Sequence, residues 1–139
     1  MNLKCTGCFG GLPNSFALGT PEAPFFQGTT PTLTVTVTLA DGVTLVDLTG
    51  AVIYLTAKSD PSDADPGLFQ LSTTGGQIAL SNQTTNKGQF VVSFPASATA
   101  SLSALLSFPF DVRVILSGNI QTVVYGPLTL SQAITQAQS

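Results

Sequence analysis

Two cysteines near the amino terminus come closest, in type and spacing, to a chemical site. Cys5 and Cys8 form a Cys-x-x-Cys motif, which is half of a zinc site or the core of a redox motif. Zinc normally takes four ligands, and the chain has no other Cys and no His. Three alternatives stay open: free packed thiols, a disulfide within this segment or to a neighbouring chain, and a metal shared between symmetry-related copies.

Catalysis has few residues to draw on. The chain has no His, which is the commonest general base, and its sole Glu is Glu22. Asp60, Asp63 and Asp65 form the densest acidic cluster, but no Glu follows at the closing position of an EF-hand. Asp and Pro at this density are typical of a surface turn. We therefore expect no enzymatic activity, no metal site and no cofactor.

Charge is unusually sparse in this chain of 139 residues. Charged residues make up 8% of the sequence, against roughly 25% in an average soluble domain, and the net charge is -3. The basic residues are Lys4, Lys58, Lys87 and Arg113. Nucleic-acid binding needs clustered Lys and Arg, so we expect no nucleic-acid partner. Thr and Ser supply the polarity, either as a solvent-facing surface or as a surface covered by neighbouring subunits.

Membrane insertion is not expected either. The most apolar stretch, residues 102–116, is interrupted by Pro109, Asp111 and Arg113 and is shorter than the roughly 20 apolar residues of a transmembrane helix. Lys4 is followed by Cys, Gly and Pro residues rather than by an apolar signal-peptide core. We expect synthesis in a cytoplasm.

Residues 1–27 combine seven Gly and Pro residues with four phenylalanines. Gly and Pro break both periodic structures, so we expect an irregular arm here. Rings without a regular element to belong to favour docking on another surface, either that of their own domain or that of a neighbour. We expect them to bind a partner, and a chain lacking residues 1–27 to fold without binding. These rings are Phe9, Phe16, Phe25 and Phe26.

From residue 28 the pattern becomes that of short β-strands. Residues 32–39 alternate strictly, which directs Leu33, Val35, Val37 and Leu39 to one face. We expect this face to be buried against Phe90, Val92 and Phe94 and against Phe110, Val112, Val114 and Leu116. Further strands are expected at 43–46, 51–58, 67–72, 77–80, 90–94, 110–116, 120–125 and 128–130, with a turn or one short helix in 96–106.

Short strands separated by turns every 8 to 12 residues indicate an all-β sandwich. We expect a single immunoglobulin-like antiparallel β-sandwich over residues 28–131. Residues 132–139 form a polar C-terminal tail. Within the sandwich, we expect residues 126–127 to separate the strand at 120–125 from a last edge segment at 128–130.

The turn-and-strand motifs from Leu48 onward also follow a distinctive order. They are 48–58, the acidic loop 59–66, 86–95, 108–114 and 125–130. This order resembles the small immunoglobulin-like sandwich of tailed-bacteriophage virion proteins, best known from the N-terminal domain of phage baseplate upper proteins. The resemblance implies a non-enzymatic structural protein of the virion, synthesised in the host bacterial cytoplasm.

Three functions stay open on this basis. The first is a capsid decoration (cement) subunit, a homo-oligomer that packs on other virion proteins such as the major capsid protein. The second is a tail or baseplate component that anchors a receptor-binding protein. Baseplate upper proteins continue into a linker and a further domain, whereas this chain stops at Ser139, so we favour the capsid. The third is a glycan-binding module, which the absence of Trp and the placement of Tyr54 and Tyr125 in strands disfavour.

Overall fold

A computed structural model describes residues 2–20, 25–26, 28–60, 62, 64, 67–100, 102 and 107–131. Strands dominate this part of the chain, and one helical turn interrupts them. The elements are β1 (Asn2–Cys8), β2 (Asn14–Ser15), β3 (Thr32–Thr38), β4 (Val52–Ala57), β5 (Phe69–Ser72), β6 (Ile78–Leu80), β7 (Gln89–Ser93), α1 (Ala96–Thr99), β8 (Ser107–Leu116) and β9 (Asn119–Thr129).

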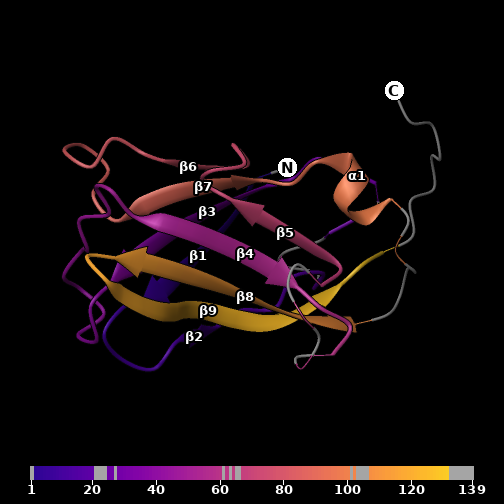
Figure 1. Cartoon of the computed structure of the whole chain (residues 1–139), viewed down its shortest axis with the longest axis horizontal. Helices are drawn as coiled ribbons and strands as arrows, with labels where there is room; N and C mark the ends of the chain where they lie inside the picture. Colours follow the sequence, from indigo (N-terminus) through magenta and orange to yellow (C-terminus); the bar gives the residue numbers. More distant parts are fainter. Residues whose placement is uncertain are drawn as a thin grey trace.

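The strands form two sheets packed face to face (Figure 1). One sheet has the order β1-β3-β7-β6 and the other the order β2-β9-β8-β4-β5. The expected all-β sandwich is confirmed. It is not purely antiparallel, however, because β1 pairs with β3 and β2 pairs with β9 in parallel.

The alternation of β3 gives the core its first row. Leu33, Val35 and Val37 are completely buried, and the intervening threonines are half-buried on the opposite face. Leu39 does not continue the row and is 42% exposed. The strand ends at Thr38, and the backbone N–H of Leu39 donates to the carbonyl of Thr44 in the following turn. The expected burial of Leu39 is therefore wrong.

The rest of the core comes from the expected strands. Phe90, Val92 and Phe94 are at most 1% exposed, and Phe110, Val112 and Val114 at most 3%. Leu116 is partly buried at the margin of the core. Strand β4 is central, since it pairs with β5 on one side and β8 on the other. The predicted packing of these faces is confirmed.

Strand β9 runs unbroken through Gly126 and Pro127, which corrects the expected separation at these residues. Pro127 lies directly opposite Pro109 in the β8–β9 ladder. The carbonyl of Pro109 accepts the N–H of Lys58, and that of Pro127 accepts the N–H of Leu18. Both carbonyls thus point away from the facing proline, so Pro109 and Pro127 form a non-hydrogen-bonded pair of the ladder. Such a pair needs no backbone N–H from either residue, and a proline is therefore tolerated at both positions.

A bulge interrupts the same ladder. Val112 pairs with Val124, but Arg113 pairs with Thr122, which leaves Val123 as the extra residue. Val123 and Val124 are both completely buried. Because the bulge shifts the alternation by one residue, Ile120 points to the same outer face as Tyr125.

The N-terminal segment is part of both sheets rather than an irregular arm. Strand β1 pairs with β3 over seven residues, and β2 extends the second sheet beyond β9. Burial in β1 alternates: Leu3 and Gly7 are buried, and Lys4 and Thr6 are exposed. The backbone ladder therefore outweighs the low strand propensity of Gly.

The smaller expectations have mixed outcomes. Residues 43–46 form no strand beyond a single bridge between Leu45 and Thr38. The short helix expected within 96–106 is confirmed as α1, whose Thr99 is completely buried. The C-terminal tail, 132–139, lies outside the described residues.

Candidate functional site

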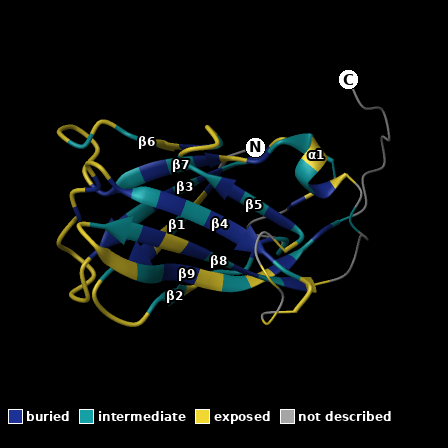
Figure 2. Cartoon of the chain, in the orientation of Figure 1, coloured by how far each residue is buried: buried dark blue, intermediate teal, exposed yellow. Residues whose placement is uncertain are grey.

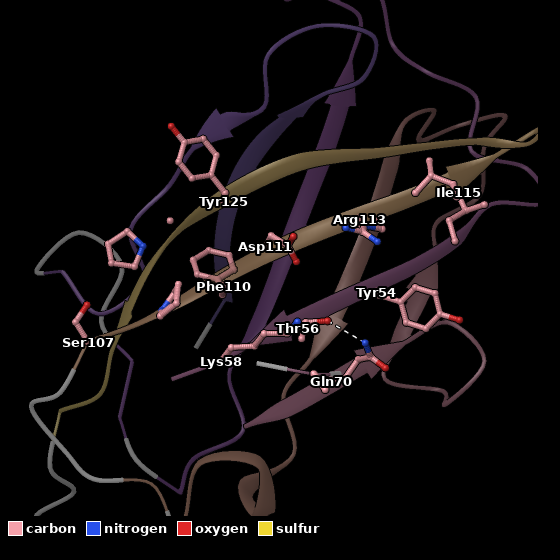
Figure 3. A pocket seen from close by; sticks show the side chains of 15 residues that line it. Tyr54, Thr56, Lys58, Gln70, Ser107, Phe110, Asp111, Arg113, Ile115 and Tyr125 are labelled. Atoms are coloured by element: carbon pink, nitrogen blue, oxygen red, sulfur yellow. Dashed lines mark hydrogen bonds between the residues drawn. The ribbon is translucent and has the colours of Figure 1, made fainter. Parts of the chain in front are cut away.

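The outer face of the five-stranded sheet is hollowed. The hollow has a volume of about 1230 Å³, which exceeds the roughly 300–1,000 Å³ of a compact small-molecule pocket. Its polar and aromatic lining comes from the strands β4, β5, β8 and β9 and the loop after β4 (Figure 3). We call this surface the sheet hollow; the side chains that characterise it are Tyr54, Lys58, Gln70, Asp111, Arg113 and Tyr125.

Strand alternation places these side chains outside the core. On β8, Phe110, Val112 and Val114 point inward, so Asp111 and Arg113 point outward. Tyr125 lies opposite Asp111 on one neighbouring strand, and Tyr54 lies opposite Arg113 on the other. The two tyrosines consequently stand on opposite sides of the charged pair (Figure 3).

Hydrogen bonding orients part of this surface. The Gln70 amide donates to the Thr56 hydroxyl over 3.0 Å, from β5 to β4 (Figure 3). Lys58 and Asp111 also make interactions within the chain, and Arg113 is exposed. The sheet hollow thus presents a fixed amide, a carboxylate and a guanidinium, all able to bind polar ligands.

A second surface lies at the end of the sandwich where the loops gather, on the left in Figure 2. Among the described residues, five of the seven exposed large hydrophobic side chains lie here. We call this surface the apolar end. It consists of Leu12 (88% exposed), Val43 (79%), Ile120 (61%), Leu39 (42%) and Leu45 (40%).

Contacts between the loops make the apolar end continuous. A β-carbon on Gly11 would lie 3.1 Å from that of Ala40, which brings the loop after β1 against the loop after β3. The N–H of Gly10 donates to the side chain of Gln121 near the start of β9. The three loops that carry the exposed side chains are therefore neighbours.

Side-chain hydrogen bonds hold the same loops in place. Asp41 accepts the N–H groups of Val43 and Thr44, each over 2.9 Å. Gln83 accepts the N–H groups of Leu48 and Gly88, each over 2.9 Å. A surface that is ordered before binding loses less conformational entropy when a partner docks.

The cysteines do not form a site together. Both are free thiols in β1, where Cys5 is half-buried and Cys8 is buried. Three residues along a strand separate them by about 10 Å, beyond the roughly 7 Å that a disulfide spans. The candidate disulfide within the segment is therefore wrong. Burial raises the pKa of the Cys5 thiol to about 12, which makes this thiol a poor nucleophile and metal ligand.

The structure places the four N-terminal phenylalanines mainly on their own domain. Phe25 is completely buried, with its ring 4.9 Å from that of Phe94 in an edge-to-face contact. Phe9 and Phe16 are half-buried against the core, and Phe26 is 38% exposed. Binding of a partner by Phe25 is therefore ruled out in this fold.

Asp60, the described member of the acidic cluster, makes the hydrogen bonds of a turn. Asp60 accepts the N–H and the hydroxyl of Ser62, each over 2.9 Å. Asp63, Asp65 and Glu22 lie outside the described residues. Within the described part of the chain, no group of three or more Cys, Asp or Glu side chains could hold a metal ion.

No protein-family model matches this chain, and no curated protein matches it significantly. In the described ranges, no helix is long and apolar enough to cross a membrane. The functions of the sheet hollow and the apolar end therefore have to be inferred from their own chemistry.

Proposed function

We propose that this protein is a non-enzymatic structural subunit of a bacteriophage virion, a capsid decoration protein that acts by packing on other virion proteins. The observation that carries the proposal is the apolar end. Exposed apolar side chains gathered on neighbouring loops at one end of a domain are typical of a surface that another protein covers. The loops beneath it are held by side-chain hydrogen bonds, which favours permanent attachment to another virion protein.

Two further features favour a packing function over an enzymatic one. The described residues offer no nucleophile with an activating base, since the chain has no His and the Cys5 thiol is protonated. The surface is poor in charge, and interface centres are depleted of charged residues. The apolar end would also serve for homo-oligomerisation or for attachment in the tail or baseplate. These alternatives differ only in the protein that covers this surface.

The test is co-sedimentation of purified protein with virions stripped of it. The double variant Leu12→Ser, Val43→Ser removes the two most exposed apolar side chains. We expect it to keep the circular dichroism and Tm of the parent and to lose binding to the particles. Tyr125→Ser is the matched control, because Tyr125 is 47% exposed but lies in the sheet hollow.

Equal binding by the double variant and the parent would remove the apolar end as the seat. A reconstruction of the virion gives an independent answer, because the position of this protein distinguishes capsid from tail. Density absent from both would contradict the virion assignment altogether.

A second candidate, glycan attachment, is favoured by one specific observation. Both tyrosines of the chain, Tyr54 and Tyr125, line the sheet hollow. Tyrosine rings offer an apolar face and a polar tip, which suits a sugar ring with its alternating C–H and hydroxyl groups. The placement of both tyrosines in strands, which disfavoured this function from the sequence, positions them outward.

A further inference from the structure

The sheet hollow carries a charge opposite to that of the whole chain. Two of the four basic residues, Lys58 and Arg113, line it, against one described carboxylate, Asp111. Two positive charges and one negative charge give the described lining residues a charge of +1, in a protein whose net charge is -3. The complementary ligand is therefore an anion.

Arg113 is the residue best placed to receive that anion. Its side chain is exposed near the middle of the hollow, whereas Lys58 and Asp111 already interact within the chain (Figure 3). A guanidinium is always charged and binds a carboxylate through two parallel hydrogen bonds. A carboxylate is thus the anionic group that this position fits.

The spacing of the two tyrosines indicates the shape of the ligand. Tyr54 and Tyr125 stand two strand spacings apart and two residues out of register, which is a Cα separation of roughly 12 Å. Tyr125 is 47% exposed and Tyr54 is half-buried. Two ring faces at this spacing, with polar groups between them, suit an extended ligand that has several small rings.

The backbone argues against an extended peptide. Strands β8 and β4, which form the middle of the hollow, are paired on both sides, so their backbones offer no free ladder edge to a peptide there. The two aliphatic side chains of the hollow, Ile115 and Ile120, lie opposite each other at one end of it, which leaves the region around Arg113 to polar and aromatic side chains. The groups it does present are an amide, a carboxylate and a guanidinium, which pair with hydroxyls and acids.

We infer that the sheet hollow binds an acidic oligosaccharide, with Arg113 holding a sugar carboxylate and Tyr54 and Tyr125 stacking on sugar rings. This inference rests on the second candidate function, glycan attachment, and is distinct from the packing function, because the sheet hollow shares only Ile120 with the apolar end. Its ligand is a chain of uronic acids or other carboxylated sugars. The inference does not depend on where in the virion the protein resides.

The test uses the full chain and tetragalacturonate as the probe, with binding measured by calorimetry and by amide chemical shifts. Two matched probes separate the contributions. Fully methyl-esterified tetragalacturonate keeps the sugar skeleton without the charge, and capped tetraglutamate keeps the charge without the sugar. We expect tetragalacturonate alone to bind and to shift the amides of β4, β8 and β9 around the hollow.

Variants then locate the contacts. Arg113→Gln should weaken binding by about 10- to 100-fold, the effect of losing a charged hydrogen-bond partner. Lys87→Gln is the control, since it makes the same charge change at an exposed position outside the hollow. Tyr125→Ala should also weaken binding, and circular dichroism should show that all three variants stay folded.

Three results would each overturn the inference. They are no binding of tetragalacturonate, equal or tighter binding of tetraglutamate or of the methyl ester, and equal weakening by Lys87→Gln and Arg113→Gln. Since the probes are free sugars, failure here leaves the co-sedimentation test of the packing function unaffected.

Discussion

A β-carbon on Gly126 would collide with the backbone carbonyl of Phe16. The N-terminal segment lies directly against β9 at this point, and the N–H of Phe16 donates to the carbonyl of Tyr125 over 2.9 Å. Gly19 approaches the backbone of Thr129 in the same way, three residues further along both segments. These glycines are what allows the segment to pack against the last strand.

We therefore expect Gly126→Ala to destabilise the protein by at least about 2 kcal/mol, because backbone atoms must move to admit the methyl group. For a chain of this size, the Tm should fall by roughly 4–8 °C. Gly76→Ala is the control: its φ is +86°, but no atom lies within 4 Å of the added carbon. Thermal denaturation should rank Gly126→Ala well below Gly76→Ala, and the reverse order would place the crowding elsewhere.

Two adjacent aromatic residues should differ sharply in their contribution to stability. Phe25 is completely buried against Phe94, so Phe25→Ala should cost about 3–5 kcal/mol in the free energy of unfolding. Phe26 is 38% exposed, so Phe26→Ala should cost only about 1–2 kcal/mol. Urea titration of the pair measures both values. Similar costs would mean that Phe25 does not belong to the core.

Removal of residues 1–27 should consequently unfold the domain instead of merely detaching it from a partner. The deletion takes away β1, β2 and the buried side chains of Leu3, Leu18 and Phe25. It also exposes the long edges of β3 and β9, which invites aggregation. Circular dichroism and light scattering decide the matter, and a soluble, folded product would restore the independent-arm hypothesis.

The Cys5 thiol should be unreactive in the folded protein. Its pKa is raised by burial from 9.0 to about 12, so the thiolate is scarce at neutral pH. The burial contributes stability below pH 9.0, and this contribution is lost as the pH rises toward 12. A disulfide-exchange reagent should label Cys5 in denaturant but not in native buffer. Rapid labelling of native protein would contradict the assigned burial.

Three aspartates should make the stability of the loops sensitive to acid. Asp41, Asp47 and Asp60 accept hydrogen bonds from nearby hydroxyl and backbone N–H groups, which lower the pKa of each carboxyl from 3.8. A lowered pKa stabilises the fold above pH 3.8, and this stabilisation is lost as the pH falls through the folded pKa. The Tm of the parent should therefore fall below that pH. The Tm of a variant with all three aspartates replaced by Asn should fall less over the same pH range. A parent Tm that is unchanged in acid would disprove the linkage.

The sequence predicted the elements whose alternation is unambiguous. The Thr-and-Val pattern of β3 and the aromatic row of β7 determined both the strands and their buried faces. Strand β1 was missed because its inward positions, Leu3, Cys5 and Gly7, include a weakly strand-forming Gly and because further Gly and Pro residues follow it. Their period of two was nevertheless present. The break expected at Pro127 failed because the pairing of Pro127 with Pro109 depends on another strand.

The sheet hollow was predictable only in part. The alternation of β8 already turned Asp111 and Arg113 away from the core. Nothing local to the sequence indicated that Tyr54 and Tyr125 would flank them, because strand order is a property of the whole fold. The bulge at Val123, which turns Ile120 outward, is visible in the sequence only as two successive valines.

The contact of the N-terminal segment with β9 has a consequence for folding during synthesis. Gly10 and its partner Gln121 are 111 positions apart, so the earlier residue can meet its partner only after the start of β9 has left the ribosome. Closing so long a loop is entropically slow, and contacts of this kind delay folding. The sandwich should therefore stay incomplete until β9 has been synthesised, and until then the earlier segment needs protection from aberrant pairing.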